Sequence, residues 1–269
     1  MTDVKPQIPV VPEDPPSFVV RTEAQKAAFD NGYRLEKGVE GGWLRYGSTT
    51  AHGDIWIAGA SAHGPWLLSL GHPGVAAELG GAAQAAAVVP GVTTFVFDGL
   101  APLYAALERV YRLGRSLPDA PLRQFRAKTQ DLPRSTEAER LIVQRVGQDI
   151  FRDALLGYWN GRCPLTGISD PALLRASHIV RWADCETDSQ RLDVYNGLLL
   201  SALWDAAFDA GLVSFADDGL VLVSPNLGLE AETALGLGKP KYLAGLTEAH
   251  RENLGWHRHR YGFNSVLIR

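Results

Sequence analysis

Cysteine and long apolar runs are both scarce in this chain of 269 residues. Its two cysteines, Cys163 and Cys185, allow at most one disulfide and exclude a four-cysteine zinc site. No apolar run approaches the ~18 residues of a membrane-spanning helix. Residues 1–20 carry acids and prolines where a secretory signal has a basic start and an apolar centre. We therefore expect a cytoplasmic protein with free thiols, no structural zinc and no membrane partner.

An excess of positive charge is also missing. Lys and Arg total 26 against 30 Asp and Glu, so the formal net charge is -4. That balance excludes a polycationic coat for nucleic acid, but it allows a local basic surface. Hydrophobic residues make up 46% of the chain and charged residues 21%, which is typical of a globular protein with a substantial core. The length allows one large domain or two ordinary ones.

Proline, glycine and polar stretches divide the chain into four parts. Residues 1–16 are proline-rich and predict an extended arm. Residues 17–117 predict a small α+β domain, because short apolar runs such as DIWIAGA and TTFVFD alternate with helical patterns over 75–88 and 100–117. Residues 118–135 are rich in Pro, Arg and polar residues and predict a linker. Residues 136–269 form a second domain, and the predicted fold class is α+β.

A well-marked helix opens this second domain. Thr136 and Glu139 have the spacing of a capping box. The residues that follow at helical spacing form one apolar stripe, namely Ile142, Val143, Val146, Ile150, Ala154 and Leu155. Further along, VSFADDGLVLVS predicts a hairpin that turns at residues 217–219.

Four residues between positions 178 and 209 have side chains suited to hydrolysis of a phosphate ester. His178 ends a short apolar stretch, and an imidazole can take a proton from water at neutral pH. Asn196 precedes a leucine run and can pin the loop that carries the histidine. Asp205 and Asp209 share one helix face at i and i+4 and can approach one ion, for which oxygen ligands favour Mg2+ or Mn2+ over zinc. Each residue alone is more typical of a structural role than of a catalytic one, so the set carries the prediction.

The residues around this set resemble a known family. CPLTGI at 163–168 and LLRASHIVRWADCETDSQRLDVYNGLLLSALWDAAFDAGLVSF at 173–215 resemble HNH endonucleases of the ββα-metal superfamily, in particular the bacterial HNH restriction endonucleases. The resemblance covers about residues 136–219. It implies a C-terminal ββα-metal (HNH) nuclease domain behind the small N-terminal α+β domain. It also implies His178 as general base on a hairpin, Asn196 in a loop, and a helix that holds one Mg2+ or Mn2+ ion.

Two positions depart from the usual pattern of that family. Asp205 stands where the final histidine of the motif usually stands, and Ser177 stands where many relatives carry an Asp or His ligand. The chain therefore resembles an H-N-D version of the motif. The implied metal ligands are Asp205, Asp209 and Asn196, completed by water.

Arginines and tryptophans complete the expected DNA contacts. Arginines beside the motif and on the preceding helix are candidate phosphate contacts, although a solvated face also fits those on the helix. The predicted DNA-binding set is Arg175, Arg181, Arg145 and Arg152. Aromatic rings can stack on a flipped base, although a place in an ordinary core is the more typical role for each of them. The candidates for base recognition are Trp43, Trp56 and Trp66.

The leading prediction is a metal-dependent DNA endonuclease that hydrolyses phosphodiester bonds. Its role would be that of a restriction enzyme whose N-terminal domain reads double-stranded DNA, in a modified or unmodified form. Because one HNH site cuts one strand, double-strand cleavage would require a homodimer. The alternative is a catalytically inactive DNA-binding or modification-sensing protein on an HNH scaffold, which Ser177 and Asp205 support. A toxin that acts in competitor cells is a third interpretation, for which the sequence offers no delivery segment.

Overall fold

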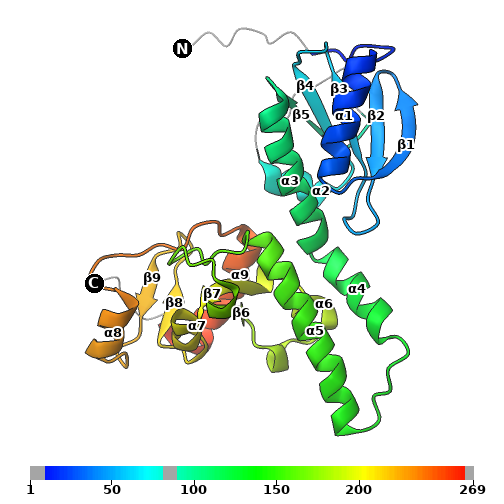
Figure 1. The fold of residues 1–269 in the computed structure, drawn as a ribbon. Coiled ribbons are helices and arrows are strands. Elements are labelled where there is room, and N and C mark those ends of the chain that lie inside the picture. Colours follow the sequence, from blue (N-terminus) through cyan, green and yellow to red (C-terminus); the bar gives the residue numbers. More distant parts are fainter. Residues whose placement is uncertain (1–9, 81–89, 264–269) are drawn as a thin grey trace. The chain divides into compact units, whose positions relative to one another are not determined.

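The structure is a computed structural model that describes residues 10–80 and 90–263. It divides into two compact units, Met1–Arg115 and Ser116–Arg269, which Figure 1 draws in blue to green and in green to red. The predicted helix over 75–88 lies partly outside the described residues. Each unit is described by itself.

The first unit is an antiparallel sheet with helices packed on it. Its strands pair in sequence order, so each strand pairs with the next one along the chain. They are β1 (Leu35–Glu40), β2 (Trp43–Gly47), β3 (Ile55–Gly59), β4 (Trp66–Leu70) and β5 (Thr93–Phe97). The helices are α1 (Phe18–Asp30), α2 (Pro73–Leu79) and α3 (Leu100–Ser116), and α1 contacts β2 and β3. The amphipathic pattern predicted at 100–117 therefore forms a helix.

Two of the three tryptophans proposed to read a base belong to the core of this sheet. Trp43 is 5% exposed and Trp66 is 1% exposed. Strand β4 is buried at every position, so its side chains on both faces are covered. This burial removes Trp43 and Trp66 from the candidates for base stacking. Trp56 is half-buried, and the guanidinium of Arg45 lies 5.2 Å from its ring centroid.

The second unit contains the helices and short strands that position the motif residues. They are α4 (Asp119–Thr129), α5 (Glu137–Tyr158), β6 (Leu174–His178), α6 (Asp188–Arg191), β7 (Gly197–Ser201), α7 (Ala202–Asp209), β8 (Val213–Phe215), β9 (Val221–Val223), α8 (Leu229–Leu235) and α9 (Glu248–Arg260). Three short 3-10 helices connect them, η1 (Pro171–Leu173), η2 (Trp182–Asp184) and η3 (Val194–Asn196). The predicted hairpin turn at 217–219 joins β8 to β9, and Gly219 adopts a φ of 88° there.

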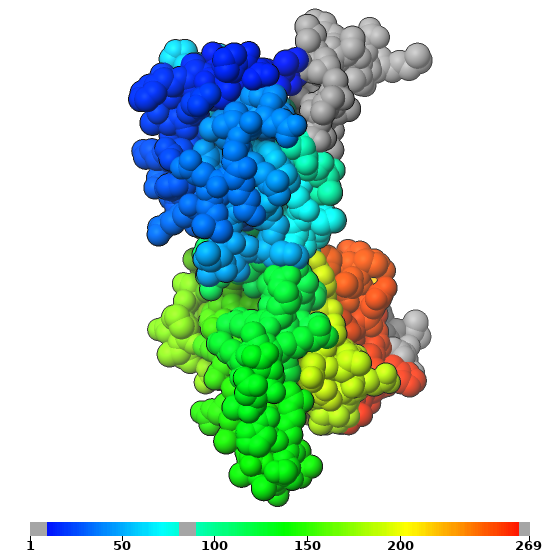
Figure 2. All heavy atoms as spheres, turned by 90° about the vertical axis from the view of Figure 1, so that its right-hand side faces the viewer, coloured from blue at the N-terminus to red at the C-terminus, as the bar shows by residue number. Residues whose placement is uncertain are grey.

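The stretch 118–135, expected to be a linker, instead contains helix α4. Its side chains at Pro121, Phe125 and Thr129 are buried, and α4 contacts both α5 and α6. The buried residues recur every four positions, which is the pattern of an amphipathic helix. The prediction of a linker gave more weight to the arginines and prolines than to this pattern. In the space-filling view, this part of the second unit is the green surface (Figure 2).

Helix α5 is the central support of the second unit. The predicted capping box is formed, with the Thr136 side chain accepting from Glu139 N and the Glu139 carboxylate accepting from Thr136 N. The buried face includes Val143, Ile150 and Leu155 of the predicted stripe. It also includes Gly147 and Phe151, whereas Ile142 is 56% exposed. The buried stripe therefore differs from the prediction at its N-terminal end.

The α+β fold class is confirmed by the sheet of the first unit and the mixed elements of the second. Among the described residues, no helix has the length and apolar character needed to cross a membrane.

Candidate active site

A hairpin followed by a helix gathers the motif residues. Strands β6 and β7 pair antiparallel from Leu174↔Ser201 to His178↔Gly197, and α7 begins immediately after β7. All five residues of β7 are buried, because α5 and α7 both pack against this hairpin. The apolar run GLLLS therefore forms a covered strand, and His178 lies at the end of its neighbour.

The side chain of His178 is held in one tautomer and one orientation. Its Nε2 lies 2.9 Å from the carbonyl oxygen of Arg191, so Nε2 must carry the hydrogen and Nδ1 keeps its lone pair. The imidazole stacks on the Phe151 ring with centroids 3.8 Å apart, and it contacts the Trp182 ring edge to face at 5.6 Å. Burial lowers the pKa of His178 to about 4, although the bond to Arg191 opposes this shift. The ring is therefore neutral at pH 7 and can accept a proton.

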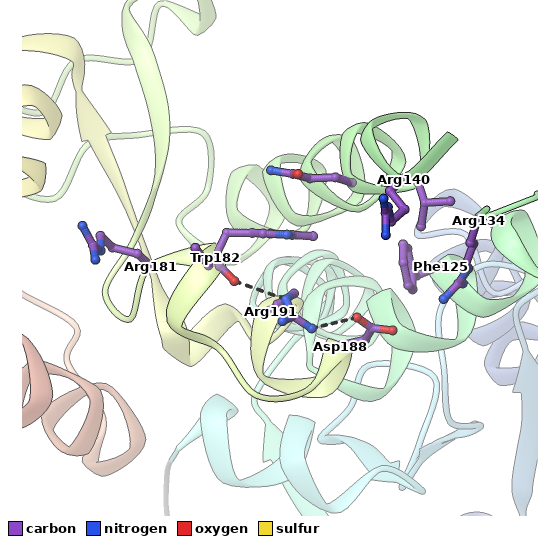
Figure 3. Close-up of a pocket in the computed structure, with 10 residues that line it drawn as sticks. Phe125, Arg134, Arg140, Arg181, Trp182, Asp188 and Arg191 are labelled. Atoms are coloured by element: carbon purple, nitrogen blue, oxygen red, sulfur yellow. Dashed lines mark hydrogen bonds and ion pairs between the residues drawn. The ribbon is translucent and has the colours of Figure 1, made fainter. Parts of the chain in front are cut away.

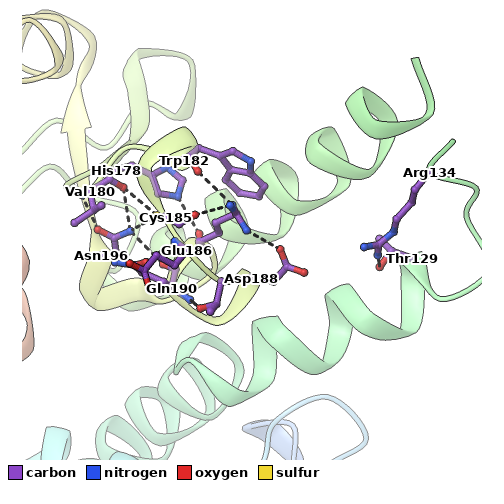
Figure 4. Close-up of polar contacts among 12 residues, drawn as sticks. Thr129, Arg134, His178, Val180, Trp182, Cys185, Glu186, Asp188, Gln190 and Asn196 are labelled. Carbon is purple, nitrogen blue, oxygen red and sulfur yellow. Dashed lines mark hydrogen bonds and ion pairs between the residues drawn. The ribbon is translucent and has the colours of Figure 1, made fainter. Parts of the chain in front are cut away.

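Asn196 holds the two ends of the connecting loop together. Its Oδ1 accepts from Val180 N at 2.7 Å, and its Nδ2 donates to Val180 O at 3.1 Å and to Gln190 O at 3.1 Å (Figure 4). Nδ2 also lies 3.4 Å from Cys185 Sγ. The side chain is fully buried. Because the amide is committed to these contacts, the geometry favours a loop-pinning role over the metal-ligand role that the resemblance implied.

The two carboxylates of α7 lie one helical turn apart. Asp205, in the first turn of α7, is half-buried, and desolvation raises its pKa. The charge of Asp209 adds to that rise, while Ser177 and Arg175 oppose it. Asp209 is more exposed, and partial desolvation raises its pKa against the effect of Arg181. Both carboxylates therefore lie where a cation would stabilise their charged forms.

Ser177 contributes an oxygen atom to the same place. It is 2% exposed, and the Asp205 carboxyl is its polar neighbour. The Ser177 hydroxyl lowers the pKa of that carboxyl. The oxygens of Ser177, Asp205 and Asp209 therefore fit a hard divalent cation with its water ligands.

The predicted DNA-binding arginines have different surroundings. Arg152 donates to Leu174 O and Pro171 O, both at 2.9 Å, so it braces β6 and η1. Arg175 donates to Ala172 O at 2.9 Å and remains exposed, and Arg181 forms an ion pair of 2.7 Å with Asp184. Arg145 is exposed on α5. The guanidinium contacts of Arg152 favour a structural role for this residue.

Arg191, Phe151 and Trp182 shape the site and were not predicted from the sequence. Arg191 supplies the carbonyl that orients His178, and its guanidinium donates to Trp182 O, Cys185 O and Asp188. The sequence offered one signal for Arg191, because the run RLDVYNG places it shortly before Asn196 of the motif. Both cysteines are buried and free.

A comparison with known families agrees with this geometry. The family described as HNH endonuclease matches residues 163–216, which include His178, Asn196, Asp205 and Asp209. No curated protein matches the chain. The chain thus contains an HNH endonuclease domain, as the sequence motifs predicted. At the level of this family, the domain belongs to nucleases that act on nucleic acid, and such nucleases generally use divalent metal ions.

Proposed function

We propose that this protein is a DNA endonuclease that hydrolyses phosphodiester bonds with one Mg2+ or Mn2+ ion, and that it serves as a restriction enzyme. The observation that supports it most strongly is the environment of His178. This imidazole is neutral, its Nε2 hydrogen is committed to Arg191 O, and its Nδ1 is available as a base. The Ser177 hydroxyl on β6 and the Asp205 carboxylate on α7 are neighbours in the same hairpin and helix.

His178 acts as the general base in this proposal. Nδ1 removes a proton from a water molecule as the water oxygen bonds to phosphorus, and the P–O bond to the leaving oxygen breaks. The leaving oxygen takes a proton from solvent. The Phe151 ring, stacked at 3.8 Å, prevents the imidazole from turning, and the Arg191 carbonyl keeps the hydrogen on Nε2. Fixing the tautomer in the ground state avoids reorganisation during proton transfer.

Asp205, Asp209 and Ser177 would hold the cation. When bound, a divalent ion supplies positive charge to the phosphate and to the leaving oxygen. Asn196 acts as a positioning residue, because its amide holds Val180 and Gln190 on either side of the loop that follows His178. Arg175 and Arg181 contact phosphates of the DNA on either side of the hairpin.

The first unit would select the DNA, in a modified or unmodified form. Burial leaves Trp56, with Arg45 beside its ring, as the one tryptophan of the original three that retains partial exposure. Double-strand cleavage would bring two copies of the chain together, since each carries one HNH site. The inactive sensor is the alternative, and its support remains the serine and aspartate at positions where many relatives carry other ligands.

The test is cleavage of plasmid DNA, prepared from strains with different DNA modifications, by purified protein with Mg2+ or Mn2+. We expect nicking or cutting that His178→Ala lowers by at least about a hundredfold, as loss of a general base does. The exposed His63 provides the control, and His63→Ala should cut like the parent. Equal cleavage by His178→Ala and the parent would refute the assignment of the base. Binding without cleavage of any substrate would favour the inactive sensor.

A further inference from the structure

A groove lined by arginines lies beside the hairpin, inside the second unit. Its volume is about 780 Å3, and it is formed by α4, α5 and the loop that follows β6 (Figure 3). We call it the arginine groove and define it by Arg134, Arg140, Arg181 and Arg191. A groove of this size holds a ligand of nucleotide size.

Positive charge in the groove exceeds negative charge. Asp188 is the acidic residue among those that line it, and Arg191 pairs with this carboxylate at 3.1 Å. The Arg140 side chain has no hydrogen bond or ion pair with another described residue, whereas its backbone N–H donates to Thr136 O at 3.1 Å. Arg134 directs one donor to Thr129 Oγ1 at 3.3 Å, as Figure 4 shows. Both guanidinium groups therefore keep donors for an anionic ligand, and a guanidinium can bind phosphate with two parallel hydrogen bonds.

Part of the groove lining is apolar. Phe125 is 3% exposed and Val143 is 9% exposed, and both line the groove. Trp182 packs against Gly147 so closely that a Cβ at this glycine would come within 2.5 Å of the indole. Cations beside an apolar lining are suited to a phosphate backbone whose sugars or bases lie against the rings.

The groove leads to the candidate active site. Trp182 lines the groove, and its ring lies 5.6 Å from the His178 ring. Arg181 also lines the groove, and its charge acts on Asp209 on α7. The cations therefore continue from the α4–α5 connection and α5 toward the general base and the carboxylates.

We infer that the arginine groove binds the phosphodiester backbone of the DNA strand that flanks the scissile phosphate. This inference rests on the proposed nuclease function and assigns part of its substrate contact to Arg134 and Arg140, which the motif does not contain. Continuity with the HNH site favours a nucleic acid over an acidic protein segment as the occupant. Helix α4 is then a part of the DNA-binding surface.

The experiment measures binding of the full chain to a short fluorescent DNA duplex by anisotropy, in EDTA so that no cleavage occurs. The double variant Arg134→Gln/Arg140→Gln removes two phosphate contacts. Each contact contributes about 0.9 to the slope of log K against log salt, so the slope should fall by about 1.8. Near 0.15 M salt, affinity should be roughly thirtyfold weaker, and it should approach that of the parent near 1 M salt. Arg126 is an exposed arginine on α4 outside the groove, so Arg126→Gln is the control and should bind like the parent.

The two variants and the cleavage assay separate the groove from the chemistry. A double variant whose affinity and salt slope match those of Arg126→Gln would overturn the inference, even if the parent cuts DNA. If the parent binds DNA but never cuts it, and the double variant binds more weakly, DNA binding by the arginine groove is supported and the proposed cleavage is refuted. Mn2+ binding by the double variant, measured by calorimetry, should equal that of the parent, because neither arginine belongs to the oxygen set on α7 and β6. Loss of Mn2+ binding in this variant would overturn the inference by showing a general structural effect.

Discussion

Replacement of Asn196 by alanine tests how the loop after His178 is held. The change removes three hydrogen bonds to backbone groups, those of Val180 N–H, Val180 C=O and Gln190 C=O, although the Cys185 thiol still contacts Val180 O at 3.4 Å. Asn196 is fully buried, so water does not replace these hydrogen bonds without movement of the loop. An unsatisfied buried polar group costs about 1–3 kcal/mol. Because the loop can partly relax, we take the lower value for each group and expect a loss of about 3 kcal/mol in the free energy of unfolding.

The assay is urea unfolding in the absence of metal, combined with amide hydrogen exchange. A typical m value of about 2 kcal/mol/M converts this loss into a midpoint about 1.5 M lower for the transition of the second unit. Protection of the Val180 amide, which donates to Asn196 Oδ1, should fall by about a hundredfold. Asn226 is exposed, and Asn226→Ala should change stability by less than about 0.5 kcal/mol. A loss below about 1 kcal/mol with Val180 still protected would refute the pinning role.

The same variant distinguishes the pinning role from a metal-ligand role. If Asn196 only holds the loop, the Mn2+ affinity of the folded Asn196→Ala protein should fall less than the Mn2+ affinity of the Asp205→Asn protein. The second change removes the carboxylate that lies beside Ser177. An equal or larger fall for Asn196→Ala would return Asn196 to the ligand set. Both variants are compared below their unfolding transitions, so that loss of structure does not enter the measured affinity.

Three further predictions concern metal binding, packing and pH. Asp205→Asn should lower Mn2+ affinity by at least about tenfold while DNA binding in EDTA changes little, and unchanged Mn2+ affinity by calorimetry would remove Asp205 from the ligands. Gly197→Ala places a Cβ within 2.5 Å of Phe151 Cζ, so we expect a loss of about 1–3 kcal/mol in urea unfolding and slower cleavage, and full stability would contradict the packing. Burial lowers the pKa of His250 and His257 to about 4, so the unfolded chain binds more protons between pH 6.5 and 4. Stability should therefore fall as pH drops through this window, by up to about 3 kcal/mol per histidine, and His257→Gln should make the fall shallower in pH-dependent thermal unfolding.

Local sequence determined the parts of the site that lie close together along the chain. The resemblance to HNH endonucleases implied a hairpin that carries His178, which β6 and β7 form. Asp205 and Asp209 share a helix face through their spacing. The capping box of Thr136 and Glu139 was readable because capping is a contact between near neighbours in the chain. Together with the motif residues, these signals located the HNH domain that the family comparison matches.

Only the tertiary structure decided what surrounds those residues. The tautomer and pKa of His178 depend on Phe151 and on the Arg191 carbonyl, which come from separate elements. The burial of Trp43 and Trp66 depends on which faces of a sheet are covered, and residue type alone does not specify this. The groove lined by Arg134 and other arginines exists because α4 packs on α5 and α6. Spacing in the chain therefore determined the local geometry of the motif, whereas long-range packing set its electrostatics and the surface around it.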